Sequence, residues 1–252
     1  MIVDCYAHAS CRKYQPVERL IKEMRDAGVD AAVLVQPLGD YDNGYLQEVI
    51  GRYPRRFQAV GLVEPGAASL PTTVCALVRN GISGIRATAD FLKVDGAVGA
   101  LAASDGVLLT HLPAGIGAHA TELASIAERY PKLRIFVPHL GWPRMNGNPT
   151  PSWKEAVSSL SRYPNISFGI SALYYYSQQA SPHEDTWPWI EFLLQKLGPE
   201  RCMCGSDFPL LLDTDRYCDY SALFFDDDFG VSSPKRDMLL GSSAMKFWRF
   251  ES

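Results

Sequence analysis

The sequence lacks the features that would tie the chain to a membrane, to export or to nucleic acid. No apolar run reaches the ~18 residues that a membrane span requires. No basic segment precedes an apolar stretch at the N-terminus, so we expect no signal peptide. The net charge is -4, and no basic stripe typical of nucleic-acid binding is present. We therefore predict a cytoplasmic protein with a small-molecule substrate and with neither nucleic acid nor membrane as a partner; a homo-oligomer is an open alternative.

The sequence also lacks an obvious division into parts. No linker rich in proline, glycine or serine separates two regions, and neither a repeat nor a low-complexity tract is visible. The chain has 252 residues, of which 47% are hydrophobic, and one α/β barrel typically uses about 250 residues. We therefore predict a single domain over residues 1–252. The six cysteines are scattered, which favours reduced, buried thiols over a disulfide framework.

Segments typical of buried strands alternate with amphipathic helices along the whole chain. Apolar residues in 17–24 follow helical spacing, with Pro16 before them and Gly28 after them as start and stop signals. The last helix is expected near 233–248. The expected strands are 2–8, 29–36, 57–63, 82–87, 107–111, 133–139, 166–170 and 202–206.

Eight such pairs, with strands apolar on both faces, predict the α/β class and a (β/α)8 TIM barrel. A doubly wound open sheet would also explain the alternation. It would not bring the first and last strands together.

Four polar residues stand at or just past the ends of four expected strands. They are His8, His111, His139 and Asp207. The C-terminal strand ends of a (β/α)8 barrel converge on one mouth, where catalytic groups collect. Three imidazoles and one carboxylate at that mouth can bind a metal ion, activate water, or do both.

Several short motifs, in this order and spacing, resemble the amidohydrolase superfamily in its amidohydrolase-2 branch. The resemblance covers nearly the whole chain, and parts of it are similar to the lactonases of that branch, which act on sugar lactones and pyrone dicarboxylate. The motifs are Asp4-Cys5-Tyr6-Ala7-His8, His139-Leu140-Gly141, Gly205-Ser206-Asp207-Phe208-Pro209, Gly198-Pro199-Glu200-Arg201, Leu240-Gly241-Ser242-Ser243-Ala244, Val35-Gln36-Pro37, Arg52-Tyr53-Pro54-Arg55-Arg56-Phe57 and Gly84-Ile85-Arg86.

This resemblance implies roles for the residues at the mouth. It implies His139 as an acid or base, His111 as a metal ligand, and Asp207 as a ligand or base. The family carries His-x-His on its first strand, but here Tyr6 replaces the first histidine and leaves His8. A neutral phenol is a poor zinc ligand, because its pKa of about 10 makes ionisation costly.

The fourth strand departs from the two-metal members of the superfamily. Arg86 occupies the region where those members place a bridging carboxylate or modified lysine, and a guanidinium cannot ligate a cation. One divalent ion, Zn²⁺, held by His8, His111 and Asp207 is one prediction, and a metal-free site is the other. Arg86 is interpreted as an anchor for a substrate carboxylate, or else as the partner of Glu64 in a buried ion pair.

The predicted function is hydrolysis of a small, carboxylated lactone or a related ester or amide. Asp207 would activate water, and His8 and His139 would stabilise the oxyanion and move protons. Further candidates for substrate contact are Tyr6, Gln36, Tyr41 and Tyr174. One alternative is a decarboxylase or hydratase of the same branch that uses a single zinc ion. Another is a catalytically degenerate barrel that binds a small acid without converting it.

Overall fold

The computed structural model describes residues 1–144 and 147–250, and its centre is one sheet of eight parallel strands. Each strand pairs with the next one in the sequence, and almost every strand residue is buried. This arrangement confirms the predicted (β/α)8 barrel and excludes the doubly wound order. The strands are β1 (Val3–Ala7), β2 (Ala31–Val35), β3 (Phe57–Gly61), β4 (Gly84–Thr88), β5 (Val107–His111), β6 (Arg134–Val137), β7 (Ile166–Ser171) and β8 (Cys202–Gly205).

The barrel closes where the end of β8 meets β1. The Asp207 amide donates to the Tyr6 carbonyl at 2.7 Å, and the His8 amide donates to the Phe208 carbonyl, also at 2.7 Å. These two bonds bring the first and last predicted site residues side by side. Closure of the barrel and assembly of the site therefore depend on the same short stretch of backbone.

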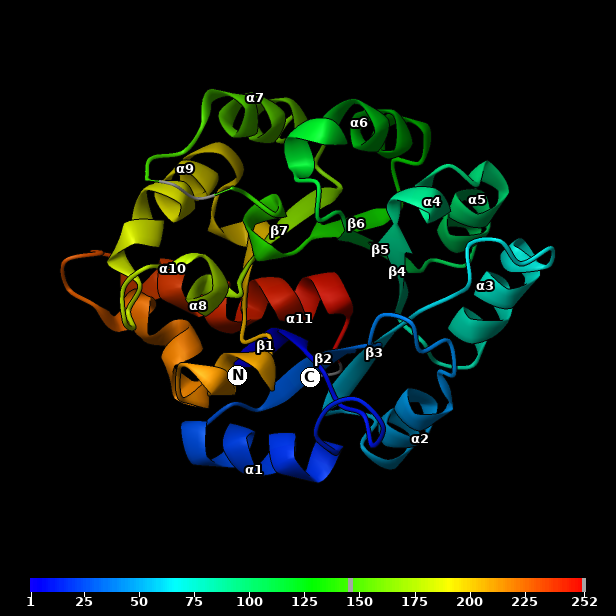
Figure 1. Ribbon diagram of the computed structural model, residues 1–252, viewed down its shortest axis with the longest axis horizontal. Coiled ribbons are helices and arrows are strands. Elements are labelled where there is room, and N and C mark those ends of the chain that lie inside the picture. The colour runs from blue at the N-terminus through cyan, green and yellow to red at the C-terminus, as the bar shows by residue number, and fades with distance from the viewer. Residues whose placement is uncertain (145–146, 251–252) are drawn as a thin grey trace.

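Most helices form a ring outside the strands, whereas α11 crosses the centre of the view and packs Ala244 and Trp248 against the side chains inside the barrel (Figure 1). Helix α1 buries Val17, Leu20 and Met24 as its spacing predicts, and Gly28 ends it with a φ of 70°. The last predicted helix is confirmed over 233–248, where α10, a π turn at Met238–Ser242 and α11 follow one another without a break. The helices are α1 (Val17–Ala27), α2 (Gly44–Arg52), α3 (Leu70–Arg79), α4 (Ala89–Leu92), α5 (Asp95–Ala103), α6 (Ala120–Arg129), α7 (Pro151–Leu160), α8 (Leu173–Tyr176), α9 (Trp187–Leu197), α10 (Ser233–Asp237) and α11 (Ser243–Trp248). None of those in the described part of the chain has the length and apolar character to cross a bilayer.

A register shift in β1 sets which side chains face the mouth. The pairing with β2 slips between Asp4 and Ala7, so this strand contains an irregularity of the β-bulge kind. After the slip, the rings of Tyr6 and His8 lie 5.3 Å apart at the mouth, whereas Asp4 bonds to Tyr217 outside the barrel. Bulges recur beside active sites because they re-aim side chains in this way.

Candidate active site

The predicted residues from β1, β5, β6 and β8 meet at the C-terminal mouth, together with Arg86 from β4. His8, His139, Asp207 and Arg86 are almost fully buried, and His111 is half-buried. Because a buried charge is costly unless it is compensated, the partners of each group indicate which protonation state the site holds.

Asp207 is held at both of its carboxylate oxygens. Its Oδ1 lies 3.5 Å from His8 Nε2, and its Oδ2 accepts a hydrogen bond of 2.7 Å from the Tyr174 hydroxyl. Burial alone would raise the pKa of Asp207, but hydrogen bonding and charge from His8, together with Tyr174, lower it below its usual value. Asp207 is therefore ionised near neutral pH.

The His8 ring lies between two oxygen acceptors. Its Nδ1 donates to the Val35 carbonyl at 2.6 Å, and its Nε2 faces the Asp207 carboxylate. A ring that faces acceptors at both nitrogens is best satisfied when it carries both protons. The geometry therefore suits an imidazolium–carboxylate pair at the centre of the mouth.

Arg86 fixes the tautomer of His111. Its Nη2 donates to His111 Nδ1 at 3.1 Å, and its Nη1 donates to the Gln36 carbonyl at 2.9 Å. A guanidinium can only donate, so His111 Nδ1 accepts and the ring proton lies on Nε2. Burial and the charge of Arg86 lower the pKa of His111 to about 3, which keeps this ring neutral. The predicted Arg86–Glu64 pair is wrong, since Glu64 is exposed and Arg86 uses these other partners.

His139 is held by Ser171 at the end of β7. Its backbone amide donates to Ser171 Oγ at 3.1 Å, and the same oxygen lies 2.9 Å from His139 Nδ1. When the hydroxyl donates to Nδ1, the ring proton stays on Nε2. Burial lowers the pKa of His139 to about 4, so this ring is also neutral at pH 7.

The backbone that carries His139 forms a left-handed turn. His139, Leu140 and Trp142 have φ values of 55°, 55° and 57°, a region that side chains other than glycine rarely occupy. The indole Nε1 of Trp153 in α7 donates to the Leu140 carbonyl at 2.8 Å and braces the turn. Conformations of this kind persist only where the surrounding structure enforces them, and they cluster at functional sites.

Aromatic rings cover the imidazoles. Tyr14 stacks on His8 with ring centroids 4.8 Å apart, and Trp142 meets His111 and His139 edge-on at 5.1 and 5.0 Å. Sequence reasoning missed Tyr14, Trp142 and Ser171. The only signal for Trp142 was its position directly after the His139 motif, and nothing in the sequence marks Tyr14 or Ser171.

The residues predicted to contact the substrate differ in whether their polar groups already have hydrogen-bond partners within the protein. The Gln36 amide nitrogen donates to two carbonyls of its own loop, and the Tyr174 hydroxyl is bonded to Asp207. Tyr41 is exposed on the same loop as Gln36. The buried Tyr6 hydroxyl has no hydrogen-bond partner in the described part of the chain, and burial raises its pKa, so it stays a neutral donor.

The predicted metal ligands do not fit an ion. His111 offers Nδ1 to a guanidinium, so the proton stays on Nε2, the nitrogen that an ion would need. Tyr6 supplies no ligand, and the Arg86 cation, bonded to the His111 ring, would repel a cation bound to the same ring. Within residues 1–144 and 147–250, no group of three or more His, Cys, Asp or Glu side chains is placed to hold a metal ion.

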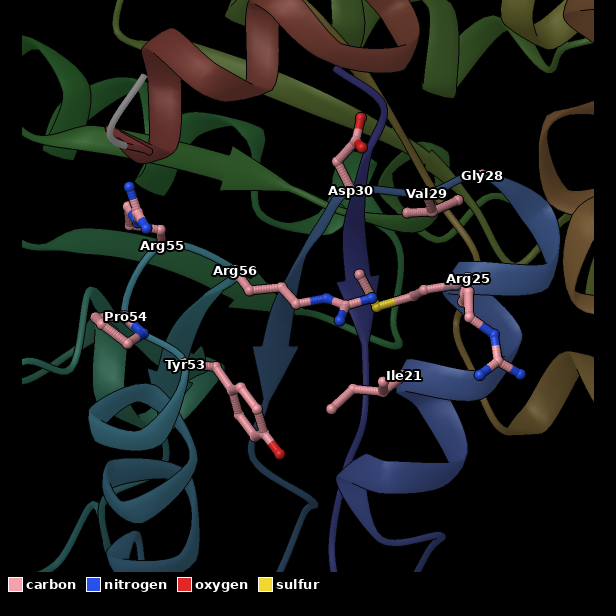
Figure 2. A pocket seen from close by; sticks show the side chains of 10 residues that line it. Ile21, Arg25, Gly28, Val29, Asp30, Tyr53, Pro54, Arg55 and Arg56 are labelled. Atoms are coloured by element: carbon pink, nitrogen blue, oxygen red, sulfur yellow. The ribbon is translucent and has the colours of Figure 1, made fainter.

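A separate groove lies at the opposite end of the barrel, where strands β2 and β3 begin. It has a volume of about 640 Å³, and Arg56 lies along it between Tyr53 and the side chains of α1 (Figure 2). None of the predicted site residues lines this groove. The N-terminal face of a barrel usually serves stability rather than chemistry.

Comparisons with known proteins agree with this architecture. A family model described as amidohydrolase matches residues 12–250. An L-fucono-1,5-lactonase from Burkholderia ambifaria is 30% identical over 215 residues, which cover 78% of this chain and 70% of the relative. A zinc-bound amidohydrolase structure from Burkholderia multivorans is 20% identical, with a TM-score of 0.83 and full coverage of both chains. A structure from Pseudomonas putida, assigned as a 2-pyrone-4,6-dicarboxylic acid hydrolase, is 22% identical, with a TM-score of 0.80 and coverage of 100% and 98%.

Proposed function

The chain belongs to the amidohydrolase family, and from this membership we propose that it hydrolyses a small lactone that carries a carboxylate. The observation that carries the proposal is the buried Asp207 carboxylate, held between His8 and Tyr174 at the mouth of the barrel. An ionised acid fixed beside protonated and neutral imidazoles is suited to activating water against a carbonyl. The similarity to an L-fucono-1,5-lactonase supports a lactone as the substrate.

The proposed reaction uses one water molecule and leaves the site unchanged. Asp207 removes a proton from the water as its oxygen attacks the lactone carbonyl carbon. The imidazolium of His8 and the Nε2–H of His111 stabilise the oxyanion that forms. His139 gives its Nε2 proton to the ring oxygen as the C–O bond breaks, and the proton held by Asp207 then restores His139.

Arg86 is the proposed anchor for the substrate carboxylate. Its side chain is 5% exposed, and it makes no ion pair with a carboxylate of the described residues. Its Nε–H is buried without a partner. A buried cation with an unused donor is well suited to a ligand anion, and a guanidinium can bind a carboxylate through two parallel bonds.

We propose that this reaction runs without a bound metal ion. The bond from Arg86 to His111 Nδ1 removes His111 from the predicted ligand set, which leaves His8 and Asp207 already paired with each other. Metal ions occur in the family, as the zinc-bound neighbour illustrates. The alternative of a single-zinc decarboxylase or hydratase needs the ligand set that the Arg86–His111 bond disrupts.

The test is a panel of carboxylated and neutral lactones, run before and after a chelator, with the metal content of the protein measured. We expect turnover of a carboxylated lactone that the chelator does not reduce. Asp207→Asn should lower kcat by about a hundredfold or more, whereas Asp227→Asn, on an exposed stretch farther along the chain, should not. One zinc per chain with chelator-sensitive activity would overturn the metal-free mechanism. Absence of turnover across the panel would overturn the lactonase proposal itself.

A further inference from the structure

Tyr174 lies beside the mouth on a short helix that follows β7. Helix α8 (Leu173–Tyr176) is a single turn, and Tyr174 is its one residue that bonds to the Asp207 carboxylate. The neighbouring Tyr175 is 69% exposed, whereas Tyr176 is buried and lies near enough to Asp207 for that charge to add to the effect of burial in raising its pKa. Of these three tyrosines, Tyr174 is the one whose hydroxyl donates to the Asp207 carboxylate.

The Tyr174 hydroxyl controls how Asp207 can turn. Asp207 has a φ of 62°, and its Oδ1 faces His8 while its Oδ2 accepts from Tyr174. A carboxylate held at one oxygen can rotate about its last side-chain bond, whereas one held at both oxygens cannot. Burial and the adjacent carboxylate raise the pKa of Tyr174, so its hydroxyl remains a donor across the working pH range.

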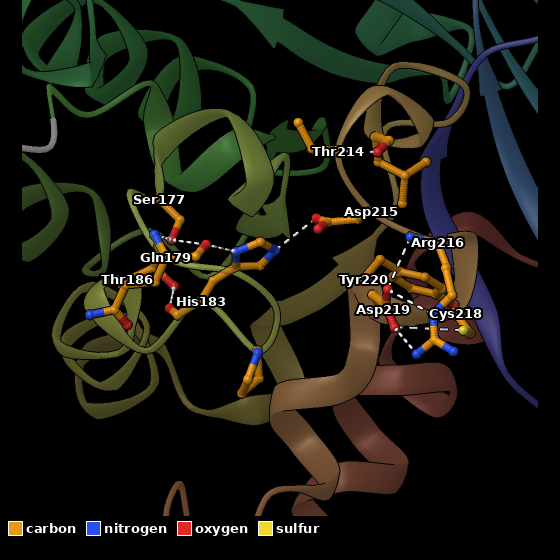
Figure 3. A network of polar contacts seen from close by, with 12 residues as sticks. Ser177, Gln179, His183, Thr186, Thr214, Asp215, Arg216, Cys218, Asp219 and Tyr220 are labelled. Carbon is orange, nitrogen blue, oxygen red and sulfur yellow. Dashed lines mark hydrogen bonds and ion pairs between the residues drawn. The ribbon is translucent and has the colours of Figure 1, made fainter.

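A buried histidine fixes the segment that carries Tyr174. His183 follows α8 in the loop before α9; its Nδ1 lies 3.1 Å from the Gln179 carbonyl, and its Nε2 lies 2.9 Å from Asp215 Oδ2 (Figure 3). Both ring nitrogens face acceptors, so this ring also suits the doubly protonated form. The side chain of His183 is 5% exposed and that of Asp215 is 10% exposed, which shields their ion pair from solvent.

This ion pair connects two loops of the mouth. Asp215 lies eight residues after Asp207 in the loop that follows β8, and His183 lies nine residues after Tyr174 in the loop that follows β7. The link from His183 to Asp215 therefore holds together the same two loops that the Tyr174–Asp207 bond joins at the site. Asp185 tightens the loop after β7, because its carboxylate accepts hydrogen bonds from the Ser177 hydroxyl and from the Gln178 amide.

We propose that Tyr174 is a positioning residue that aims the Asp207 carboxylate, and that the His183–Asp215 pair holds Tyr174 in place. This inference rests on the proposed role of Asp207 as the base. Tyr174 acts through Asp207, so its loss should slow the chemical step and leave substrate binding unchanged. A tyrosine that instead contacted the substrate would change KM.

The experiment compares Tyr174→Phe with Tyr175→Phe, which removes the same hydroxyl from the exposed neighbour. For Tyr174→Phe we expect kcat to fall about tenfold or more, as the loss of a hydrogen bond to a charged group predicts, with KM within about twofold of wild type. Tyr175→Phe should retain the wild-type values. A rise in KM at unchanged kcat would overturn the positioning role, and so would wild-type kinetics.

A double-mutant cycle tests the second half of the proposal. Asp215→Asn should also lower kcat selectively, and it should have no further effect in the Tyr174→Phe background, because both changes act through one bond. Independent, additive losses would overturn the link between the pairs. If Tyr174→Phe fails to fold, as judged by circular dichroism, Asp215→Asn alone must show the selective loss of kcat.

A crystal structure of Tyr174→Phe separates this inference from the lactonase proposal, since it requires no turnover. We expect the Asp207 side chain to rotate away from the position in which Oδ1 faces His8. An unchanged Asp207 would overturn the positioning role even in an active enzyme. A rotated Asp207 in a protein without lactone turnover would support the positioning role and leave only the reaction to be reassigned.

Discussion

Replacing Arg86 by methionine tests whether the buried guanidinium selects an anionic substrate. Methionine has similar length and no charge, so the variant removes the proposed carboxylate anchor while largely filling the same volume. A guanidinium has five N–H donors, and two of them are bonded to Gln36 and His111. Three donors remain, which is enough for a bidentate bond to a carboxylate.

The expected decrease in kcat/KM follows from the two hydrogen bonds to Arg86 that the substrate carboxylate would lose. Hydrogen bonds to charged groups contribute about 1.5–3 kcal/mol each, so the lower limit for two bonds is about 3 kcal/mol. That loss corresponds to a decrease in kcat/KM on the order of a hundredfold. The variant also frees His111 Nδ1, so a smaller decrease that is independent of substrate charge is expected in addition.

The assay compares kcat/KM for a carboxylated lactone with that for its neutral methyl ester. Arg86→Met should lower kcat/KM for the acid about a hundredfold more than it lowers kcat/KM for the ester. Arg56→Met is the matched control, because Arg56 also has a buried Nε without a partner in the described residues but lies in the groove at the other end of the barrel (Figure 2). If acid and ester lose the same factor, Arg86 does not anchor a carboxylate and the reasoning from its unused donors is refuted.

Two further predictions concern the groups that support the site. Burial raises the pKa of Asp4 from 3.8 to about 6, so the contribution of Asp4 to stability is fully present below pH 3.8 and is lost as the pH rises through 6. In denaturant unfolding, the wild type should therefore lose up to about 3 kcal/mol of stability relative to Asp4→Asn between pH 4 and 7. A difference between the two proteins that does not change with pH would contradict this. Trp153→Phe leaves the buried Leu140 carbonyl without its donor, so we expect a loss of about 1–3 kcal/mol and a lower kcat. A loss of stability with an unchanged kcat would refute the role of the turn.

The fold could be predicted from the sequence because each part of the barrel leaves a local signal. Apolar runs mark the strands, and the spacing of Val17, Leu20 and Met24 marks a helix whose end Gly28 fixes. The last helix, predicted near 233–248, is found there because its composition suits a helix throughout. A π turn inside such a segment depends on packing against the rest of the molecule, which a local pattern does not contain.

The sequence predicts which residues of the candidate site stand at strand ends, but it does not predict which side chains bond to one another there. His8 and Asp207 come together because a closed barrel places the first strand beside the last, whatever lies between them. The partners of Arg86 could not be predicted, since its choice between Glu64 and His111 depends on side-chain direction at the mouth. For the same reason, the Tyr174 hydroxyl looked free to contact substrate although it is bonded to Asp207.

Two of the proposed catalytic residues lie on unfavourable backbone, and this links stability to chemistry. His139 and Asp207 both have positive φ, which costs about 1–2 kcal/mol per residue for a side chain other than glycine. Each is held by groups far away in the sequence, His139 by Ser171 and Asp207 by the Tyr6 carbonyl. Since the mouth keeps this geometry only while those distant bonds remain, the orientation of the catalytic side chains depends on pairs of residues and not on any one motif. Two chains with the same histidines and aspartate at their strand ends can therefore differ in activity through residues that never touch the substrate.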